Sequence, residues 1–383
     1  MTTAFAGGPT FSGGQALDRS STDTPLGALE VVHTFDDGPM PTGVTVSHTG
    51  RIFVNYPKWG DEVPATVVEL VDGVPKPFPS AAWNQPASDD DANALVSVQS
   101  VVVDPADRLW ILDTGSPMFQ PTKPGGPKLV CVDLATNEVA QTIVFEPDVA
   151  LPTSYLNDVR FDLRQGEAGH AYLTDSSDGG PNGIVVVDLA TGEAWRRLHD
   201  HPSTKALGWH DDVPMAEGRV FAERTPGQPP QPVSMGSDGI AISHDGARLW
   251  FCPLISRRWY SVDTAALRDR SRSDEQVAET LVDEGDKGGG SDGLESDDRG
   301  CLYATNYEHN AVVRRLPDGE LQTIAHDERL LWPDTMSVAM DGHLYVTANQ
   351  LHRQSRYQDG EDLRTYPYYL FRLPIEGGPV LLK

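Results

Sequence analysis

Six polar residues open six similar strand-turn-strand units along the chain, and their types suit metal binding or proton transfer. They are Thr42, Gln99, Asn157, Asp238, Asp292 and Asp334. Each one precedes an apolar run, a turn that contains Asp or Gly, and a second apolar run. Short β-rich runs joined by such turns are typical of β-hairpins. The six residues therefore occupy the same position in six copies of one structural unit.

The copies recur about every 40 to 60 residues, a spacing typical of propeller blades. A further pair of β-rich runs follows most hairpins, for example residues 128–133 and 139–145. We therefore predict an all-β fold, a six-bladed β-propeller whose four-stranded antiparallel blades surround a central channel. Residues 28–35 precede the first hairpin and are expected to pair with residues 369–373. That pairing would close the ring and remove exposed sheet edges.

The six units are expected to form a single domain over residues 26–383, because each blade buries its faces only against its neighbours. Residues 1–25 are rich in Gly, Ser and Thr, and we expect this segment to be disordered. No apolar stretch is long enough to span a bilayer, and the start lacks a secretory leader pattern. A soluble protein is predicted, with a cytoplasmic location favoured over secretion. The oligomeric state is left open.

The chain carries a formal net charge of −26, which argues against nucleic acid as a partner, because phosphate binding requires a concentrated basic surface. Its three cysteines, Cys131, Cys252 and Cys301, fall in different predicted blades. This distribution predicts isolated buried thiols instead of disulfides or a metal cluster. The expected partner is a small-molecule substrate or ligand.

The innermost strands of a propeller line its channel, so the six opening residues would form a ring at one rim. Three carboxylates in one poorly solvated ring would repel each other strongly without a cation. Oxygen donors favour Ca²⁺, with Mg²⁺ or Mn²⁺ as alternatives. Asn157, Asp238 and Asp292 are the best predicted ligands, whereas Asp334 is balanced between a ligand and a structural residue. The alternative is that each Asp caps a turn through its own backbone.

The second strand of each hairpin returns to the same rim, where polar residues would orient the first ring. Long loops at this rim carry aromatic residues and histidines, and loops on a rigid scaffold commonly hold function. His201 and His210, both in the loop 199–236, are candidate general acids or bases. The residues predicted to contact a ligand are Gln99, Asp175, Tyr307, Trp332 and Asn349.

Several hairpin motifs together resemble the major royal jelly and yellow protein family. They include Gln99-Ser100-Val101, Leu156-Asn157-Asp158-Val159, Ser237-Asp238-Gly239-Ile240 and Ser291-Asp292-Gly293-Leu294. The resemblance runs from about residue 98 to about residue 351. This family is related to the six-bladed propellers of gluconolactonases and regucalcin.

The lactonase branch implies a divalent ion, held by an acid in the first blade and by Asn or Asp residues that open later inner strands. Asn157, Asp238 and Asp292 match the later positions, and the resemblance also implies that Asp292 is the general base. Pro41-Thr42-Gly43 stands where the first-blade Glu is expected, so Asp334 is a candidate for supplying the missing charge.

The leading functional hypothesis is a lactonase-type hydrolase of small molecules that uses a divalent metal to activate water. The first alternative, implied by the yellow branch, is an isomerase or tautomerase of oxidised aromatic, dopachrome-like compounds. The second is a binding protein for small aromatic ligands. A shared fold does not transfer reaction type, so these hypotheses must be separated at the site itself.

Overall fold

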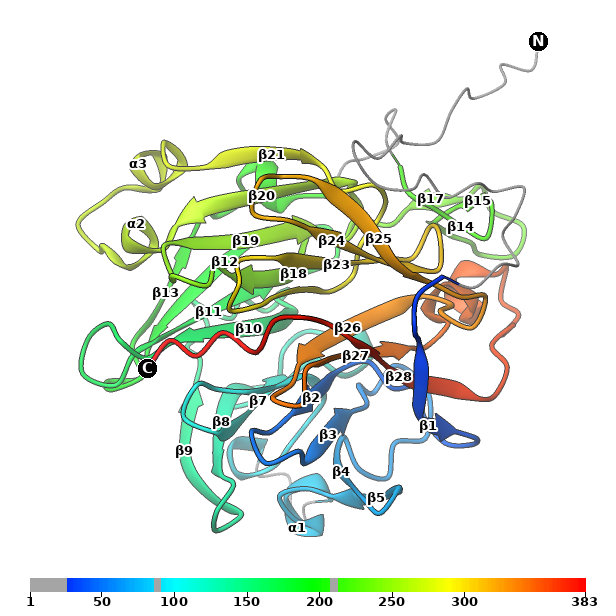
Figure 1. Ribbon diagram of the computed structural model, residues 1–383, viewed down its shortest axis with the longest axis horizontal. Helices are drawn as coiled ribbons and strands as arrows, with labels where there is room; N and C mark the ends of the chain where they lie inside the picture. The colour runs from blue at the N-terminus through cyan, green and yellow to red at the C-terminus, as the bar shows by residue number, and fades with distance from the viewer. Residues whose placement is uncertain (1–25, 86–90, 207–212) are drawn as a thin grey trace.

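A computed structural model describes residues 26–85, 91–206 and 213–383. The disorder expected for residues 1–25 and the candidate His210 fall outside the described residues. Six four-stranded antiparallel sheets are arranged in a ring (Figure 1), which confirms the predicted propeller. No helix among the described residues is long and apolar enough to cross a membrane.

Each of the first five blades is built from consecutive strands, with the innermost strand first. Blade 1 contains β2 (Val44–Val46), β3 (Ile52–Asn55), β4 (Val67–Val71) and β5 (Val74–Pro77). Blade 2 contains β6 (Val98–Val103), β7 (Arg108–Thr114), β8 (Pro127–Asp133) and β9 (Glu138–Val144). Blade 3 contains β10 (Leu156–Asp162), β11 (His170–Asp175), β12 (Gly183–Asp188) and β13 (Ala194–Arg197).

The remaining blades follow the same order. Blade 4 contains β18 (Ser237–Ile242), β19 (Arg248–Pro253), β20 (Arg258–Asp263) and β21 (Val282–Asp286). Blade 5 contains β22 (Leu294–Ser296), β23 (Leu302–Asn306), β24 (Ala311–Arg315) and β25 (Leu321–His326). Blade 6 contains β26 (Pro333–Val338), β27 (His343–Ala348) and β28 (Tyr368–Pro374), and β1 (Glu30–Phe35) is its outer strand.

The ring is closed by β1, as the sequence predicts. This strand pairs antiparallel with β28, from Glu30 opposite Arg372 to Phe35 opposite Tyr368. A strand from the start of the described chain thus completes a blade built from its end. β1 therefore covers the edge of β28, which would otherwise be unpaired.

Apolar side chains fill the spaces between blades. Trp110 of blade 2, for example, stacks on Phe161 of blade 3 with ring centroids 5.3 Å apart. The three cysteines are free and buried, in agreement with the prediction of isolated thiols. Cys131 lies on β8 and Cys252 on β19, whereas Cys301 directly precedes β23.

The helices are short and lie in the connections between strands. They are α1 (Ala81–Asn84), η2 (Asp91–Asn93), η3 (Pro117–Phe119), η4 (Pro202–Thr204), α2 (Thr264–Arg268), α3 (Asp274–Ala278), η5 (Leu351–Arg353) and η6 (Ser355–Tyr357).

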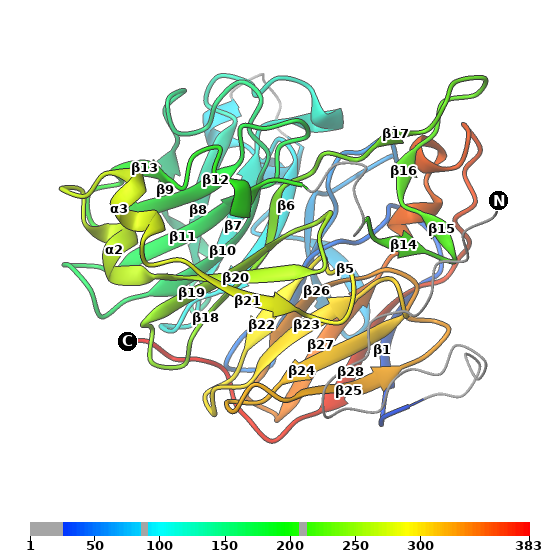
Figure 2. The same ribbon diagram turned by 90° about the horizontal axis from the view of Figure 1, so that it is seen from above.

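Two insertions lie together at one face of the ring, and we call them the cap. The first, residues 213–236, forms two small hairpins, β14 (Met215–Ala216) with β15 (Arg219–Val220) and β16 (Ala222–Glu223) with β17 (Gln231–Pro232). The second, residues 350–364, contains η5 and η6 and lies beside the hairpins in both views (Figures 1 and 2). Arg356 forms ion pairs with Glu223 and Asp178, and Glu217 binds both His352 and Arg353.

A charged side chain and the last residues of the chain lie at the far end of the channel. Arg160 reaches from blade 3 to blade 5, where its Nη2 donates to the Leu294 carbonyl at 2.7 Å. The C-terminal segment crosses this end (Figure 1), and the Leu163 amide donates to the Leu382 carbonyl at 2.8 Å. Arg160 and the C-terminal segment also line a second cavity at this end, with ≈ 70 Å³ open to a water-sized sphere.

Candidate functional site

Irregular strand pairing turns several ring residues toward the channel. The pairing register shifts between Leu156 and Val159, between Ser237 and Ile240, and between Pro333 and Met336. Asn157, Asp238 and Asp334 lie inside these irregular stretches. Such β-bulges re-aim a side chain at the end of a strand, and they occur often beside functional sites.

Two glycines bring the carboxylate-bearing strands of blades 4, 5 and 6 close together. A Cβ atom on Gly239 would lie 2.5 Å from the Asp292 carbonyl oxygen, and one on Gly293 would lie 2.3 Å from the Asp334 carbonyl oxygen. Both separations are too short for any side chain to fit. The glycine after each carboxylate therefore permits direct contact between neighbouring inner strands, as Asp238-Gly239 and Asp292-Gly293 suggest in the sequence.

The carboxyl groups of Asp238 and Asp292 are both buried and form a hydrogen bond with each other. Asn157 Nδ2 donates to Asp238 Oδ2 at 2.9 Å and to Ser176 Oγ at 3.0 Å. Trp332 Nε1 donates to Asp292 Oδ2 at 2.6 Å. No basic side chain in the described part of the chain forms an ion pair with either carboxyl group.

Burial disfavours the charged form of both carboxyl groups. It raises the pKa of Asp238 well above its ordinary value, and the charges of Asp292 and Asp334 raise it further. Burial also raises the pKa of Asp292, to about 6, although the hydrogen bonds from Trp332 and Asp238 oppose this increase. Two carboxylates in contact cannot both stay ionised in such a site. The pair is therefore expected to hold one proton between its two carboxyl groups.

The pair lies at the floor of a small cavity. Its polar lining comes from Gln99, Asn157, Ser176, Asp238, Asp292 and Gln354, and its apolar lining from Trp59, Phe119, Tyr155, Met235, Leu254, Leu351 and Tyr357. The space open to a water-sized sphere is ≈ 20 Å³. This volume holds about one water molecule or a single ion. A larger ligand requires movement of the surrounding side chains or of the cap.

One wall of the cavity is a connected group of aromatic rings from the rim loops. Trp59 stacks on Phe119 with centroids 5.3 Å apart, and Trp59 Nε1 donates to the Tyr155 hydroxyl at 2.8 Å. The Tyr155 hydroxyl in turn donates to Gln99 Oε1 at 3.1 Å. Tyr357 is contributed by the cap. The cavity thus combines an acidic floor with aromatic walls.

Asp334 and Asn349 contact each other and do not line the cavity. Asn349 Nδ2 donates to Asp334 Oδ2 at 2.6 Å, and Thr335 Oγ1 donates to Asp334 Oδ1 at 3.0 Å. Burial raises the pKa of Asp334 well above its ordinary value, and the charge of Asp292 adds to this effect. Asp334 therefore raises the pKa of Asp238 through its charge, although it does not line the cavity.

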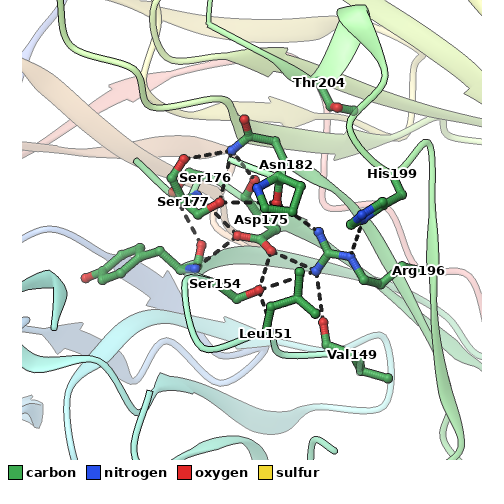
Figure 3. A network of polar contacts seen from close by, with 12 residues as sticks. Val149, Leu151, Ser154, Asp175, Ser176, Ser177, Asn182, Arg196, His199 and Thr204 are labelled. Atoms are coloured by element: carbon green, nitrogen blue, oxygen red, sulfur yellow. Dashed lines mark hydrogen bonds and ion pairs between the residues drawn. The ribbon is translucent and has the colours of Figure 1, made fainter. Parts of the chain in front are cut away.

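Asp175 lies in a separate buried network (Figure 3). Its carboxylate accepts hydrogen bonds from Ser154 Oγ at 2.6 Å and from the backbone amides of Tyr155 and Ser177. It also pairs with Arg196 Nη1 at 2.8 Å. These contacts hold the ends of β11 and its neighbours together, so Asp175 does not face the cavity, although the adjacent Ser176 does.

Three further predicted residues lie away from the cavity lining. Tyr307 and Trp332 are buried and stack on each other with centroids 4.0 Å apart, behind Asp292. His201 caps η4, where its Nδ1 lies 2.9 Å from Ser203 Oγ, and burial lowers its pKa. Of the predicted catalytic, ligand-binding and metal-binding residues, the structure brings Gln99, Asn157, Asp238 and Asp292 into one cavity.

The donors in the cavity suit a hard divalent cation. Two carboxyl groups and the amide oxygen of Asn157 offer oxygen ligands, which Ca²⁺ and Mg²⁺ prefer. The shared proton between Asp238 and Asp292 is what a bound cation would replace. No group of three or more His, Cys, Asp or Glu residues placed to bind a metal occurs among the described residues. Thr42, at the first-blade position, is instead bound by Asn55 Nδ2 at 2.9 Å.

Met235, Gln354 and Tyr357 line the cavity but were not predicted from the sequence. Met235 and Tyr357 belong to the cap. The available signal is the length of the connection, because 19 residues separate β27 from β28, whereas seven separate β11 from β12. Long insertions in a repeated unit commonly carry function.

Comparisons with known proteins agree with this architecture. Residues 96–368 match the model of the family described as "Major royal jelly protein". Protein yellow of Drosophila erecta is 26% identical over 246 residues, which cover 62% of this chain and 43% of the relative. Protein yellow of Drosophila pseudoobscura pseudoobscura is 28% identical over 250 residues, covering 61% and 41%. The chain thus matches about two fifths of the length of these curated relatives.

Solved structures share the fold at low sequence identity. A calcium-binding protein, regucalcin, from Agrobacterium tumefaciens gives a TM-score of 0.55 at 14% identity, covering 92% of this chain and 97% of its own. A gluconolactonase from Xanthomonas campestris gives a TM-score of 0.52 at 13% identity, covering 92% and 94%. These similarities concern the six-bladed architecture alone. Because the family model spans most of the propeller, the chain belongs to the major royal jelly protein family.

Proposed function

We propose that the protein hydrolyses small lactones or related esters in this cavity with the help of a divalent cation. The observation that carries the proposal is the contact between two buried carboxyl groups that lack a basic partner among the described residues. Burying such a pair is unfavourable for folding alone, so its retention at a cavity floor supports a chemical role. The regucalcin and gluconolactonase folds add an analogy and no more.

Asn157, Asp238 and Asp292 would hold the cation, which when bound would supply Lewis-acid polarisation of the scissile carbonyl. Asp292 is suited to accept a proton from the attacking water, because its pKa is about 6 and it is the ionised member of the pair. Gln99 and Ser176 offer further hydrogen bonds to substrate oxygens. The aromatic walls would exclude bulk water and strengthen these interactions.

A decisive first test is calorimetric titration of chelator-treated protein with Ca²⁺, followed by a panel of lactones. Wild-type protein should show saturable binding and Ca²⁺-dependent hydrolysis, and Asp292→Asn should lose both. The matched control is Asp341→Asn, which changes an exposed turn residue away from the cavity and should behave like wild type. Equal lactone turnover with and without chelator would rule out the metal-assisted mechanism.

A second candidate function is acid-base isomerisation of an oxidised aromatic compound. It is favoured by the proton shared between Asp238 and Asp292 and by the aromatic wall of Trp59, Phe119 and Tyr155. One carboxyl group would donate a proton while the other accepts one. Turnover of such a compound in the presence of chelator, abolished by either Asp238→Asn or Asp292→Asn, would support it. Saturable binding without turnover would instead indicate a carrier.

A further inference from the structure

Trp332 contacts Asp292 from outside the cavity. It directly precedes β26, 40 residues after Asp292 in the sequence, and its side chain is fully buried. The indole Nε1 lies 2.6 Å from Asp292 Oδ2, yet Trp332 is not part of the cavity lining. The indole therefore binds one oxygen of the carboxylate and leaves the other for Asp238 and the cavity.

Two rings stack on the indole and hold it in place. The ring of Tyr307 stacks on it with centroids 4.0 Å apart and planes 6° apart, and the ring of His352 lies 5.5 Å away at 19°. The Tyr307 hydroxyl donates to the Leu254 carbonyl at 2.7 Å, and His352 Nε2 lies 2.8 Å from Glu217 Oε2 in the cap. The indole accordingly cannot tilt without displacing these fixed partners.

The backbone at Trp332 also departs from ordinary geometry. Its φ angle is +54°, in the left-handed region that bulky residues rarely adopt. Unfavourable backbone conformations of this kind persist where the surrounding structure demands them, often at functional sites. The chain accepts this conformation at the position from which the indole reaches Asp292.

We propose that Trp332 is a positioning residue that fixes the orientation of the Asp292 carboxylate in the cavity. An indole N–H only donates hydrogen bonds, so it can bind the carboxylate in one sense alone, whereas a hydroxyl or an amide could also accept. Its bond to Oδ2 directs the remaining oxygen of Asp292 toward the cavity. The chemical consequence rests on the proposed function, but the hydrogen bond and its effect on orientation do not.

The chain contains a matched control for this interaction. Trp110 in blade 2 is also fully buried, and its Nε1 donates to Asp104 Oδ2 at 2.8 Å. Neither Trp110 nor Asp104 lines the cavity. A change that removes an indole-carboxylate bond can therefore be made at two places, of which one touches the proposed site.

Indole ¹⁵N–¹H spectra of the chelator-treated full chain test the proposed bond directly. The chain has eight tryptophans, and Trp332→Phe and Trp110→Phe identify two of the resonances. Asp292→Asn should shift the Trp332 resonance upfield and leave that of Trp110 unchanged, whereas Asp104→Asn should do the reverse. If no indole resonance moves in Asp292→Asn, the proposal is overturned, and this outcome can be read even if Trp332→Phe itself does not fold.

Calorimetric titration with Ca²⁺ alone then tests the consequence of the bond. Trp332→Phe should weaken Ca²⁺ binding about tenfold, the effect expected when a residue that orients a metal ligand is removed. Trp110→Phe should leave the affinity unchanged. Wild-type affinity in Trp332→Phe would contradict the positioning role. If wild-type protein binds no Ca²⁺ but the indole shift occurs, the metal-dependent function fails while the positioning of Asp292 stands.

Discussion

Asp175 and Asp292 are both buried carboxylates at the same rim of the propeller, but their surroundings differ in kind. Asp175 is paired with Arg196 and accepts hydrogen bonds from Ser154 and two backbone amides. Asp292 instead faces a second carboxyl group, and an indole donates to it. The charge of Asp175 is thus balanced by an ion pair, whereas Asp292 shares a proton with its neighbouring carboxyl group.

The difference indicates that Asp175 stabilises the fold, whereas Asp292 belongs to a functional site. A buried ion pair with satisfied hydrogen bonds resists change, because loss of one partner leaves an uncompensated charge. A pair of contacting carboxyl groups costs stability whenever either one ionises. Natural proteins accept such costs mainly where activity requires them. Variants in the two networks should differ in stability, whether or not a substrate is known.

The largest effect is expected from Arg196→Met, which leaves Asp175 buried without its cation. Breaking a buried ion pair in this way typically costs about 3–5 kcal/mol. Urea unfolding at neutral pH should show this loss in the free energy of unfolding. Arg270→Gln, which removes an exposed pair with Glu193, is the control and should change stability by less than about 1 kcal/mol. Similar effects of the two variants would contradict the structural role of the Asp175 network.

Asp292→Asn should instead increase the free energy of unfolding at neutral pH. A carboxyl group whose pKa is raised by folding binds its proton more tightly in the folded state. Its stabilising contribution is therefore present below the ordinary value of 3.8 and is lost as the pH rises through about 6. This increase in the pKa of Asp292 corresponds to at most about 3 kcal/mol in the free energy of unfolding.

The free energy of unfolding should be measured with chelator present between pH 4 and pH 7, the window set by this pKa shift. It should decrease with rising pH for wild type and change less for Asp292→Asn. Asp341→Asn, at an exposed turn, should follow wild type. Parallel curves for wild type and Asp292→Asn would show that the carboxyl pair carries no stability cost.

The smallest effect is expected from Ser154→Ala. The Ser154 hydroxyl is one of several donors to Asp175, so its loss should cost about 1 kcal/mol, the typical net contribution of one hydrogen bond. Ser203→Ala, beside His201 and remote from Asp175, provides a comparison for the loss of a buried hydroxyl. A cost for Ser154→Ala as large as that of Arg196→Met would show that the network is not redundantly satisfied.

The architecture could be predicted from the sequence because the same hairpin pattern recurs in every blade. The closing strand was predictable for a related reason, since residues 28–35 form a β-rich segment that no blade uses otherwise. Asn157, Asp238 and Asp292 were predictable as neighbours because each opens an inner strand. Position in a repeat thus determines which backbone atoms converge.

Position in the repeat does not determine where a side chain finds its partners. Asp175 ends a strand just as the repeat requires, but Arg196, two strands away, draws it into an ion pair. Asp334 opens an inner strand, yet Asn349 and Thr335 bind both of its oxygens. The part played by Trp332 depends on a left-handed backbone angle and on stacking partners from two separate segments. None of these contacts has a periodic signature.

Because the cap covers the cavity, the exchange rate of a ligand need not follow its affinity. With ≈ 20 Å³ of open space, the cavity admits a molecule larger than water only during an excursion of the residues above it. Those residues are joined by the ion pairs of Glu217 and Arg356. Entry and exit would then follow the frequency of these excursions more than the rate of diffusion. A captured molecule would have a long residence time even if its affinity were modest.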